Sequence, residues 1–313
     1  MLHLAGIAAK KHKKSFFNQI KMNRWMYIML ASGVIYYIVF RYLPMWGLIM
    51  GFMDYMPHKG LLGSRWVGFK HFMRFFNEPA FNMLFRNTLT IGILNLVIYF
   101  PIPIILALML NEVRCLKLKK FVQTCTYIPH FVSWVVIVSI SNVIFSYESG
   151  VLNLLLNQIG MGKINFMLKP EWFYPLFFGQ IILKEAGWGT IIFLAALAGV
   201  DVSLYEASKI DGANRWKQIW YITLPAIKST IITLLILRLG RFLNTGFEHI
   251  FLMLNAMNRH VAEVFDTYVY ENGIQRGLLS YSIAVGFFKS AISLILVVSS
   301  NYLAKKVGHE GIY

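Results

Sequence analysis

The chain has 313 residues, of which 57% are hydrophobic and only 14% are charged. A soluble domain carries about 25% charged residues, so the composition excludes an ordinary soluble globular protein and indicates a membrane protein. The formal net charge of +16 does not indicate nucleic-acid binding, because the basic residues gather just outside apolar segments, where they set topology and meet anionic lipid.

Six segments are long and apolar enough to cross a bilayer, which takes about 20 residues in a helix. Pro101, Pro103 and Pro129 are expected to kink the second and third of them. The predicted fold is all-α, a polytopic membrane protein with six transmembrane helices. We predict the spans over residues 25–40 (extending past Arg41 towards Trp46), 88–111, 121–147, 173–200, 225–247 and 278–304.

The spans form one domain over residues 25–306, between a basic N-terminal segment, residues 1–24, and a short tail, residues 307–313. Six spans place both termini on the same side of the membrane. The segments on that side hold more Lys and Arg than the loops on the other side. This bias predicts that both termini are cytoplasmic.

Two segments outside the spans have a helical pattern. Residues 65–85 carry aromatic residues every three or four positions with basic residues between them, which predicts an amphipathic helix on the membrane surface or against a partner. Residues 151–162 predict a second, shorter helix that ends at a glycine.

A charged stretch on the cytoplasmic side, "YEASKIDGANRWKQIWYITLP", interrupts the apolar pattern at residues 205–225. We expect a short helix over residues 204–210 with Ser203 as its N-cap, and a turn at Asp211-Gly212, because glycine accepts a positive φ. A second helix over residues 213–222 should follow, and Pro225 should mark its junction with the fifth span. A rigid helical hairpin of this kind suits docking to a soluble protein.

This stretch resembles the EAA loop of permease subunits in type I ATP-binding-cassette (ABC) importers. The family pattern is Glu-Ala-Ala, three residues, Gly, nine residues, Ile, one residue, Leu-Pro. Its spacing is kept throughout, with Ser208 in place of the third alanine. Residues 42–55, 110–133 and 264–277 resemble the LplB-like branch of that family, which is associated with uptake of oligosaccharides and polysaccharide fragments, including uronate-containing ones.

The resemblance implies a bacterial cell membrane, a second homologous permease as heterodimer partner, an extracytoplasmic binding protein and two ATPase subunits. ATP and Mg would be bound by the ATPase subunits, since this chain has no GxxxxGK[ST] phosphate loop. We expect no enzymatic activity, no cofactor and no metal site in the chain itself. The residues implied in coupling to the ATPase are Glu206, Ala207, Ser208, Asp211, Gly212, Leu224 and Pro225.

Charged and polar residues within or beside the spans are candidates for the translocation path, because unpaired burial of charge in a membrane is costly. Arg238, Arg241, Thr245 and Glu248 recur at helical spacing and predict a polar face on the fifth span. The candidate path residues are Lys184, Glu185, Arg238, Arg241, Asn244, Glu248 and Lys289. The alternative is a set of ion pairs that lock the bundle, for example Glu185 with an arginine of the fifth span.

Four aromatic residues, Trp134, Trp188, Phe242 and Phe247, could stack on sugar rings, although packing is the commoner role of aromatics in spans. We therefore interpret the chain as the permease subunit of an importer for an oligosaccharide, and the excess of basic path residues suits an acidic one. The alternatives are a permease of the same architecture for a small sugar or polyol, and an ion-coupled secondary transporter.

Overall fold

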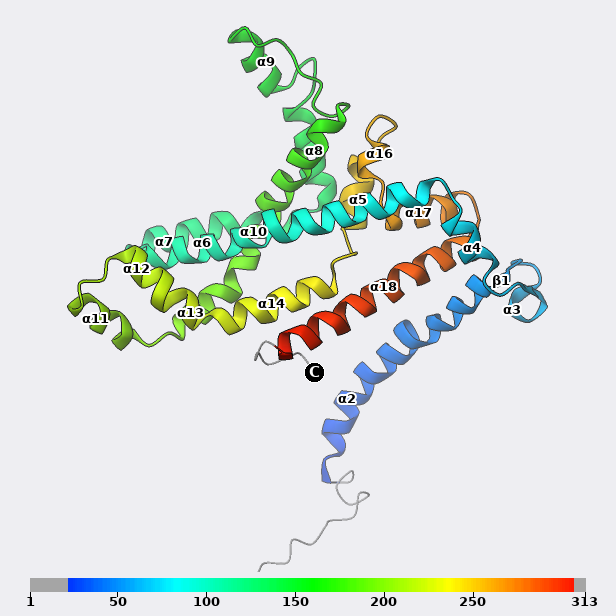
Figure 1. Ribbon diagram of the computed structural model, residues 1–313, viewed down its shortest axis with the longest axis horizontal. Coiled ribbons are helices and arrows are strands. Elements are labelled where there is room, and N and C mark those ends of the chain that lie inside the picture. The colour runs from blue at the N-terminus through cyan, green and yellow to red at the C-terminus, as the bar shows by residue number, and fades with distance from the viewer. Residues whose placement is uncertain (1–21, 307–313) are drawn as a thin grey trace, which may run out of the picture. The chain divides into compact units, whose positions relative to one another are not determined.

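The computed structural model describes residues 22–306 and divides into two compact units between Met50 and Gly51. Most of the predicted N-terminal segment and the whole predicted tail lie outside the described residues, so these two assignments stay predictions. The described part is almost entirely helical (Figure 1).

The first unit holds one long helical span. α2 (Arg24–Tyr37) runs into a π-helical turn (Ile38–Tyr42) and a 3-10 segment (Leu43–Phe52). No residue of α2 is buried, and a helix that is apolar on every side suits contact with lipid or with another subunit. The prediction of the first span is confirmed, and the helical segment continues as far as Phe52.

Three further spans are continuous, as predicted. The second is α5 (Ala80–Leu94), a π-helical turn (Asn95–Tyr99) and α6 (Pro101–Glu112); the fourth is α10 (Phe173–Ala198); and the sixth is α18 (Leu279–Lys306). The π-helical turn ends at Tyr99, two residues before Pro101, as expected where a residue without an N–H enters a helix.

The third span is bent next to Pro129, where a kink was predicted, but the bend is sharp enough to divide it into two separate helices. α7 (Leu116–Tyr127) and a 3-10 turn (Ile128–Phe131) are followed by α8 (Trp134–Ile144), whose axis is bent from theirs by 102°. Pro129 disfavours continuation of the helix, and Ser133 starts α8 as its N-cap by accepting a hydrogen bond from the N–H of Val136. Figure 1 shows α8 running at a steep angle to α7.

The fifth span is also bent. α12 (Arg215–Gln218), a π-helical turn (Ile219–Thr223) and α13 (Leu224–Ala226) meet α14 (Lys228–Gly240) at 61°. α14 ends at Gly240, and α15 (Phe247–Met253) begins after a non-helical segment that closes with Gly246 at φ +86°. The predicted helix through residue 247 is therefore wrong at its C-terminal end. With each bent pair counted as one span, the described chain has six.

The single amphipathic helix predicted over residues 65–85 is not present. A two-stranded antiparallel sheet, β1 (Met53–Asp54) and β2 (Arg65–Trp66), encloses α3 (Gly60–Gly63), and only α4 (Lys70–Phe76) is helical before α5 begins. The buried face of α4, with Phe72 and Phe75, packs against α18 of the same chain. The short helix predicted near residue 151 is confirmed as α9 (Val151–Gln158).

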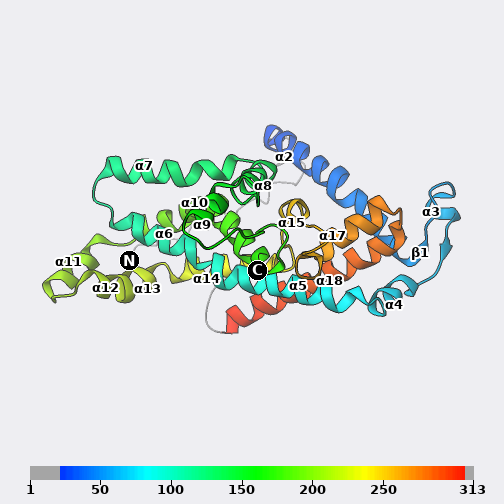
Figure 2. The ribbon, with the colours of Figure 1, turned by 90° about the horizontal axis from the view of Figure 1, so that it is seen from above.

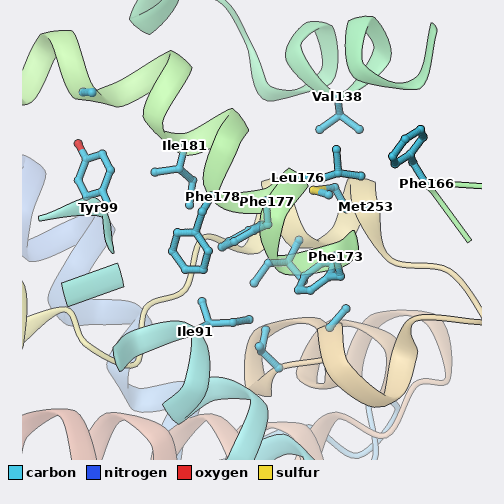
Figure 3. Close-up of a cluster of buried hydrophobic side chains, with 14 residues drawn as sticks. Ile91, Tyr99, Val138, Phe166, Phe173, Leu176, Phe177, Phe178, Ile181 and Met253 are labelled. Carbon is cyan, nitrogen blue, oxygen red and sulfur yellow. The ribbon is translucent and has the colours of Figure 1, made fainter. Parts of the chain in front are cut away.

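The largest core cluster is centred on the N-terminal half of α10 (Figure 3). Phe173, Phe177 and Phe178 are each at most 3% exposed, and they pack with residues of α5, α8 and α15. A helix this apolar on all sides is expected at the centre of a bundle. Three short elements complete the fold, namely α16 (Arg259–Ala262), α17 (Phe265–Tyr270) and a π-helical turn (Glu271–Gln275).

Gly187 of α10 lies directly against α7, since a Cβ built there would be 2.0 Å from the backbone oxygen of Thr126. Gly187→Ala is expected to force the two helices apart and to lower the free energy of unfolding by about 1–3 kcal/mol. Thermal unfolding in detergent measures this loss. Gly179→Ala is the matched control, because a Cβ on Gly179 of the same helix meets nothing within 4 Å; equal losses in both variants would contradict the prediction.

Candidate functional site

The first candidate site is the hairpin formed by α11 (Val202–Ile210) and α12–α13, at one end of the second unit (Figures 1 and 2). The predicted turn is confirmed: Gly212 has φ +74°, and the N–H of Ala213 donates to the carbonyl of Ser208. The predicted N-cap is wrong. Asp201, not Ser203, caps α11, and its carboxylate accepts the N–H of Ser203 at 2.9 Å. This hydrogen bond holds the pKa of Asp201 below its usual value.

The two helices of the hairpin are joined by side-chain hydrogen bonds. The hydroxyl of Ser208 donates to the carbonyl of Tyr205 and accepts from Nε2 of Gln218 at 3.0 Å. The hydroxyls of Tyr205 and Thr223 are 3.0 Å apart. Gln218 and Thr223 are only 4% and 3% exposed, so these bonds hold the hairpin as one rigid piece.

The hairpin presents its other side chains outward. Glu206, Ala207 and Asp211 are exposed, and within the described chain Glu206 has no ion-pair partner. Ile210 is 87% exposed. An apolar side chain and an unpaired carboxylate on a rigid projection are a combination suited to docking.

The hairpin also contacts the C-terminal end of α6. Nη1 of Arg215 lies 3.2 Å from Oε2 of Glu112, at the C-terminal end of α6. Both side chains are more than one-third exposed, so the pair contributes little to stability. It nevertheless ties the hairpin to the second span. Among the remaining predicted coupling residues, Leu224 is half-buried and Pro225 is exposed.

The second candidate site is a cavity of about 280 Å³ in the second unit, which we call the central cavity. It lies between the middle of the second span, α10, the end of α14 and the start of α15. It is lined by Ile91, Gly92, Asn95, Leu96, Tyr99, Trp134, Ile181, Glu185, Arg238, Arg241, Phe242, Asn244, Thr245, Gly246 and His249.

Arg238 is held in the cavity wall by two residues that sequence reasoning missed. Asn95 Oδ1 accepts hydrogen bonds from Nε of Arg238 at 2.8 Å and from Nη2 at 2.5 Å. The guanidinium lies 4.6 Å from the centre of the Tyr99 ring, a cation–π contact. The hydroxyl of Tyr99 in turn donates to the backbone carbonyl of Glu185. A polar Asn within an apolar span is the signal that could have identified this site.

Glu185 does not pair with an arginine of the fifth span, which was the example given for an ion-pair lock. Its Oε2 is 2.9 Å from Nδ1 of His130, and its Oε1 is 3.6 Å from Nζ of Lys184. The His130 ring stacks on Trp188 at 4.4 Å. The single carboxylate in the cavity wall is therefore already paired with two nitrogen-bearing side chains.

Lys184 lies beside the cavity but does not line it. Only 7% exposed, it donates to the carbonyls of His130 at 2.5 Å and Val132 at 2.7 Å. These carbonyls belong to the break in the third span, where no helical N–H reaches them. Lys184 thus satisfies the backbone of the break that turns α8 and brings Trp134 to the cavity.

Of the remaining candidates for the translocation path, two line the central cavity and two do not. Arg241 and Asn244 line the cavity, but from the non-helical segment that follows α14, so the predicted helical face does not continue through them. Glu248 is exposed away from the cavity lining, and Lys289 is paired with Asp266 at 2.5 Å.

Two of the four aromatic candidates, Trp134 and Phe242, line the cavity. Trp134 is supported from behind by His249, whose ring stacks on it at 3.9 Å and on Phe177 at 4.4 Å. Phe242 sits against Gly92, where a Cβ would come within 2.8 Å of its ring. The cavity thus combines two arginines, amides and aromatic faces, a set of groups suited to binding a polyhydroxylated, anionic molecule.

The fold and these two sites define a polytopic helical membrane transport protein. Residues 99–309 match the family of binding-protein-dependent transport system inner membrane components, and the chain belongs to this family. This confirms the predicted resemblance, and it sets aside the alternative of an ion-coupled secondary transporter.

Relatives and solved structures agree with this family. The chain is 55% identical to the polygalacturonan/rhamnogalacturonan transport system permease protein YteP of Bacillus subtilis, over 99% of this chain and 96% of that protein. It is 51% identical to protein LplB of the same organism, over 96% and 94%. A crystal structure of a bacterial ABC transporter involved in import of the acidic polysaccharide alginate matches with a TM-score of 0.87 at 38% identity, covering 94% of this chain and 99% of that one.

Proposed function

We propose that this chain is the permease subunit of an ABC importer for an acidic oligosaccharide. The observation that carries this proposal is the charge of the central cavity. Arg238 and Arg241 line it, whereas its one carboxylate, Glu185, is already paired with His130 and Lys184. The cargoes for which the relatives are named, polygalacturonan or rhamnogalacturonan and alginate, support it.

The partners follow from the family. A second permease completes the membrane part, two ATPase subunits bind ATP and Mg, and a binding protein delivers the cargo. A related alginate transporter, 37% identical, was crystallised in complex with its oligosaccharide-bound periplasmic protein, which supports the last of these partners. We place the hairpin and both termini in the cytoplasm, where the hairpin docks to an ATPase subunit through Glu206 and Ile210.

The two arginines in the wall allow a direct test. Arg238→Gln and Arg241→Gln are each expected to raise the KM for uptake of an oligogalacturonate about ten- to a hundredfold, because each removes a charge-assisted hydrogen bond to a carboxylate. The KM for a neutral galactose oligomer of the same length should not change by more than about twofold in either variant.

The measurement is uptake by the complete complex in proteoliposomes. Lys169→Gln is the control, since it removes a positive charge from an exposed residue outside the cavity. Equal losses for the acidic and the neutral oligomer would contradict the proposal of an acidic cargo.

A further inference from the structure

A second cavity, of about 330 Å³, lies on the other side of α15; we call it the outer cavity. Its wall includes Phe251, Asn255, Arg259, Glu271 and Gln275. It is built around α15–α17, and Figures 1 and 2 show α17 towards the end of the unit opposite to the hairpin. If the hairpin is cytoplasmic, the outer cavity is on the side from which cargo arrives.

Arg259 presents hydrogen-bond donors to this cavity. Its Nη1 is bonded to Glu263 Oε1 at 2.9 Å and to Glu271 Oε2 at 2.6 Å. The two glutamates are 4% and 18% exposed, whereas Arg259 is 44% exposed. The carboxylates therefore fix the guanidinium from the inside. Its Nη2 and Nε have no partner in the described chain, and their N–H groups can bind hydroxyls or a carboxylate.

A cluster of three aromatic rings lies beside the outer cavity, and Phe251 of this cluster lines it. Phe247 and Phe251 are four residues apart on α15 and stack at 5.4 Å, and Tyr270 lies 5.1 Å from each of them. Phe251 is 40% exposed. Exposed aromatic faces of this kind can pack against the C–H face of a sugar ring.

The two cavities share α15 as a wall. Gly246 and His249 line the central cavity, and Phe251 and Leu254 line the outer one. A helix rises 1.5 Å per residue, so residues 246 and 254 are about 12 Å apart along the axis. A chain of several sugar units spans that distance, whereas a monosaccharide does not.

We propose that the outer cavity is a second saccharide subsite, which holds one unit of an oligosaccharide while another unit of the same chain occupies the central cavity. This inference rests on the proposed function and adds to it a requirement for cargo length. Phe251 supplies the stacking surface, and Arg259 and Gln275 bind the hydroxyl or carboxylate groups of the same unit.

The test compares cargo lengths in the complete importer. Uptake of a digalacturonate and a pentagalacturonate is measured for the wild type, Phe251→Ala and Ala256→Trp. Ala256 is an exposed residue in the lining of the outer cavity, so Ala256→Trp fills this cavity without removing an existing contact. Met257→Ala, a neighbouring exposed residue outside the lining, is the control.

Both variants are expected to raise the KM for the pentamer about three- to tenfold, the size of one aromatic contact, and to leave the KM for the dimer unchanged. An equal change for both lengths, or no change in either variant, would overturn the second subsite while leaving the proposed function intact. Failure of the wild type to take up either oligomer would overturn both.

Discussion

Glu206→Lys is expected to reduce uptake more than tenfold while the chain still inserts and assembles in the membrane. Glu206 is exposed and has no ion-pair partner among residues 22–306, so the substitution disturbs no ion pair of the described fold. In the complex, we expect this carboxylate to meet a basic group of the ATPase subunit. Reversal of a charge within a desolvated interface pair costs 2–5 kcal/mol or more. If this contact is not rigid, the movement that ATP drives in the ATPase subunits is not transmitted to the membrane spans.

The measurement pairs uptake with ATP hydrolysis stimulated by the binding protein in proteoliposomes. Glu148→Lys, at an exposed position outside the hairpin, is the matched control. Charge reversal of the facing ATPase residue should restore part of the activity. Normal uptake by Glu206→Lys would show that the hairpin does not couple through this residue.

Substitution of Lys184 is expected to cause a large loss of stability and of uptake. Lys184→Met keeps most of the side-chain volume but removes the ammonium that donates to the carbonyls of His130 and Val132. Two carbonyls at the break of the third span then lose a donor, and Glu185 keeps only His130. Breaking a buried charged network in this way costs about 3–5 kcal/mol. We therefore expect a clear fall in the thermal unfolding temperature in detergent, together with weaker uptake because Trp134 is no longer fixed.

Lys184→Arg provides a conservative comparison, since it keeps a cation at the break and should recover part of the stability. Lys163→Met controls for loss of an exposed lysine, whose Nζ donates to the carbonyl of Glu148 and lies 5.8 Å from the centre of the Tyr147 ring. If Lys184→Met unfolds at the wild-type temperature, Lys184 does not hold the bent third span together.

Much of the fold could be predicted because membrane insertion imposes a local rule. A span needs about 20 apolar residues whatever the rest of the chain does, and α10 and α18 were therefore visible in the sequence within a few residues of their ends. The hairpin could be predicted for a similar reason, because it depends on residues close together in sequence. Its turn needs a glycine at residue 212, where φ is +74°, and its motif is short. Its N-cap was misassigned because Asp201 and Ser203 are both good capping residues, and only the backbone geometry distinguishes them.

The sharpness of the bend in the third span and the lining of the central cavity were decided by tertiary contacts. Pro129 predicted a kink within residues 121–147 but not its size, and the 102° bend is held by Lys184, which is more than fifty residues away in sequence. Asn95 and Arg238, 143 residues apart, meet only because the second and fifth spans pack together. The sequence by itself therefore determined the membrane class, the spans and the hairpin. Only the tertiary structure decided which charges line the cavity and which ones support the bundle, because side-chain pairing between spans has no period along the chain.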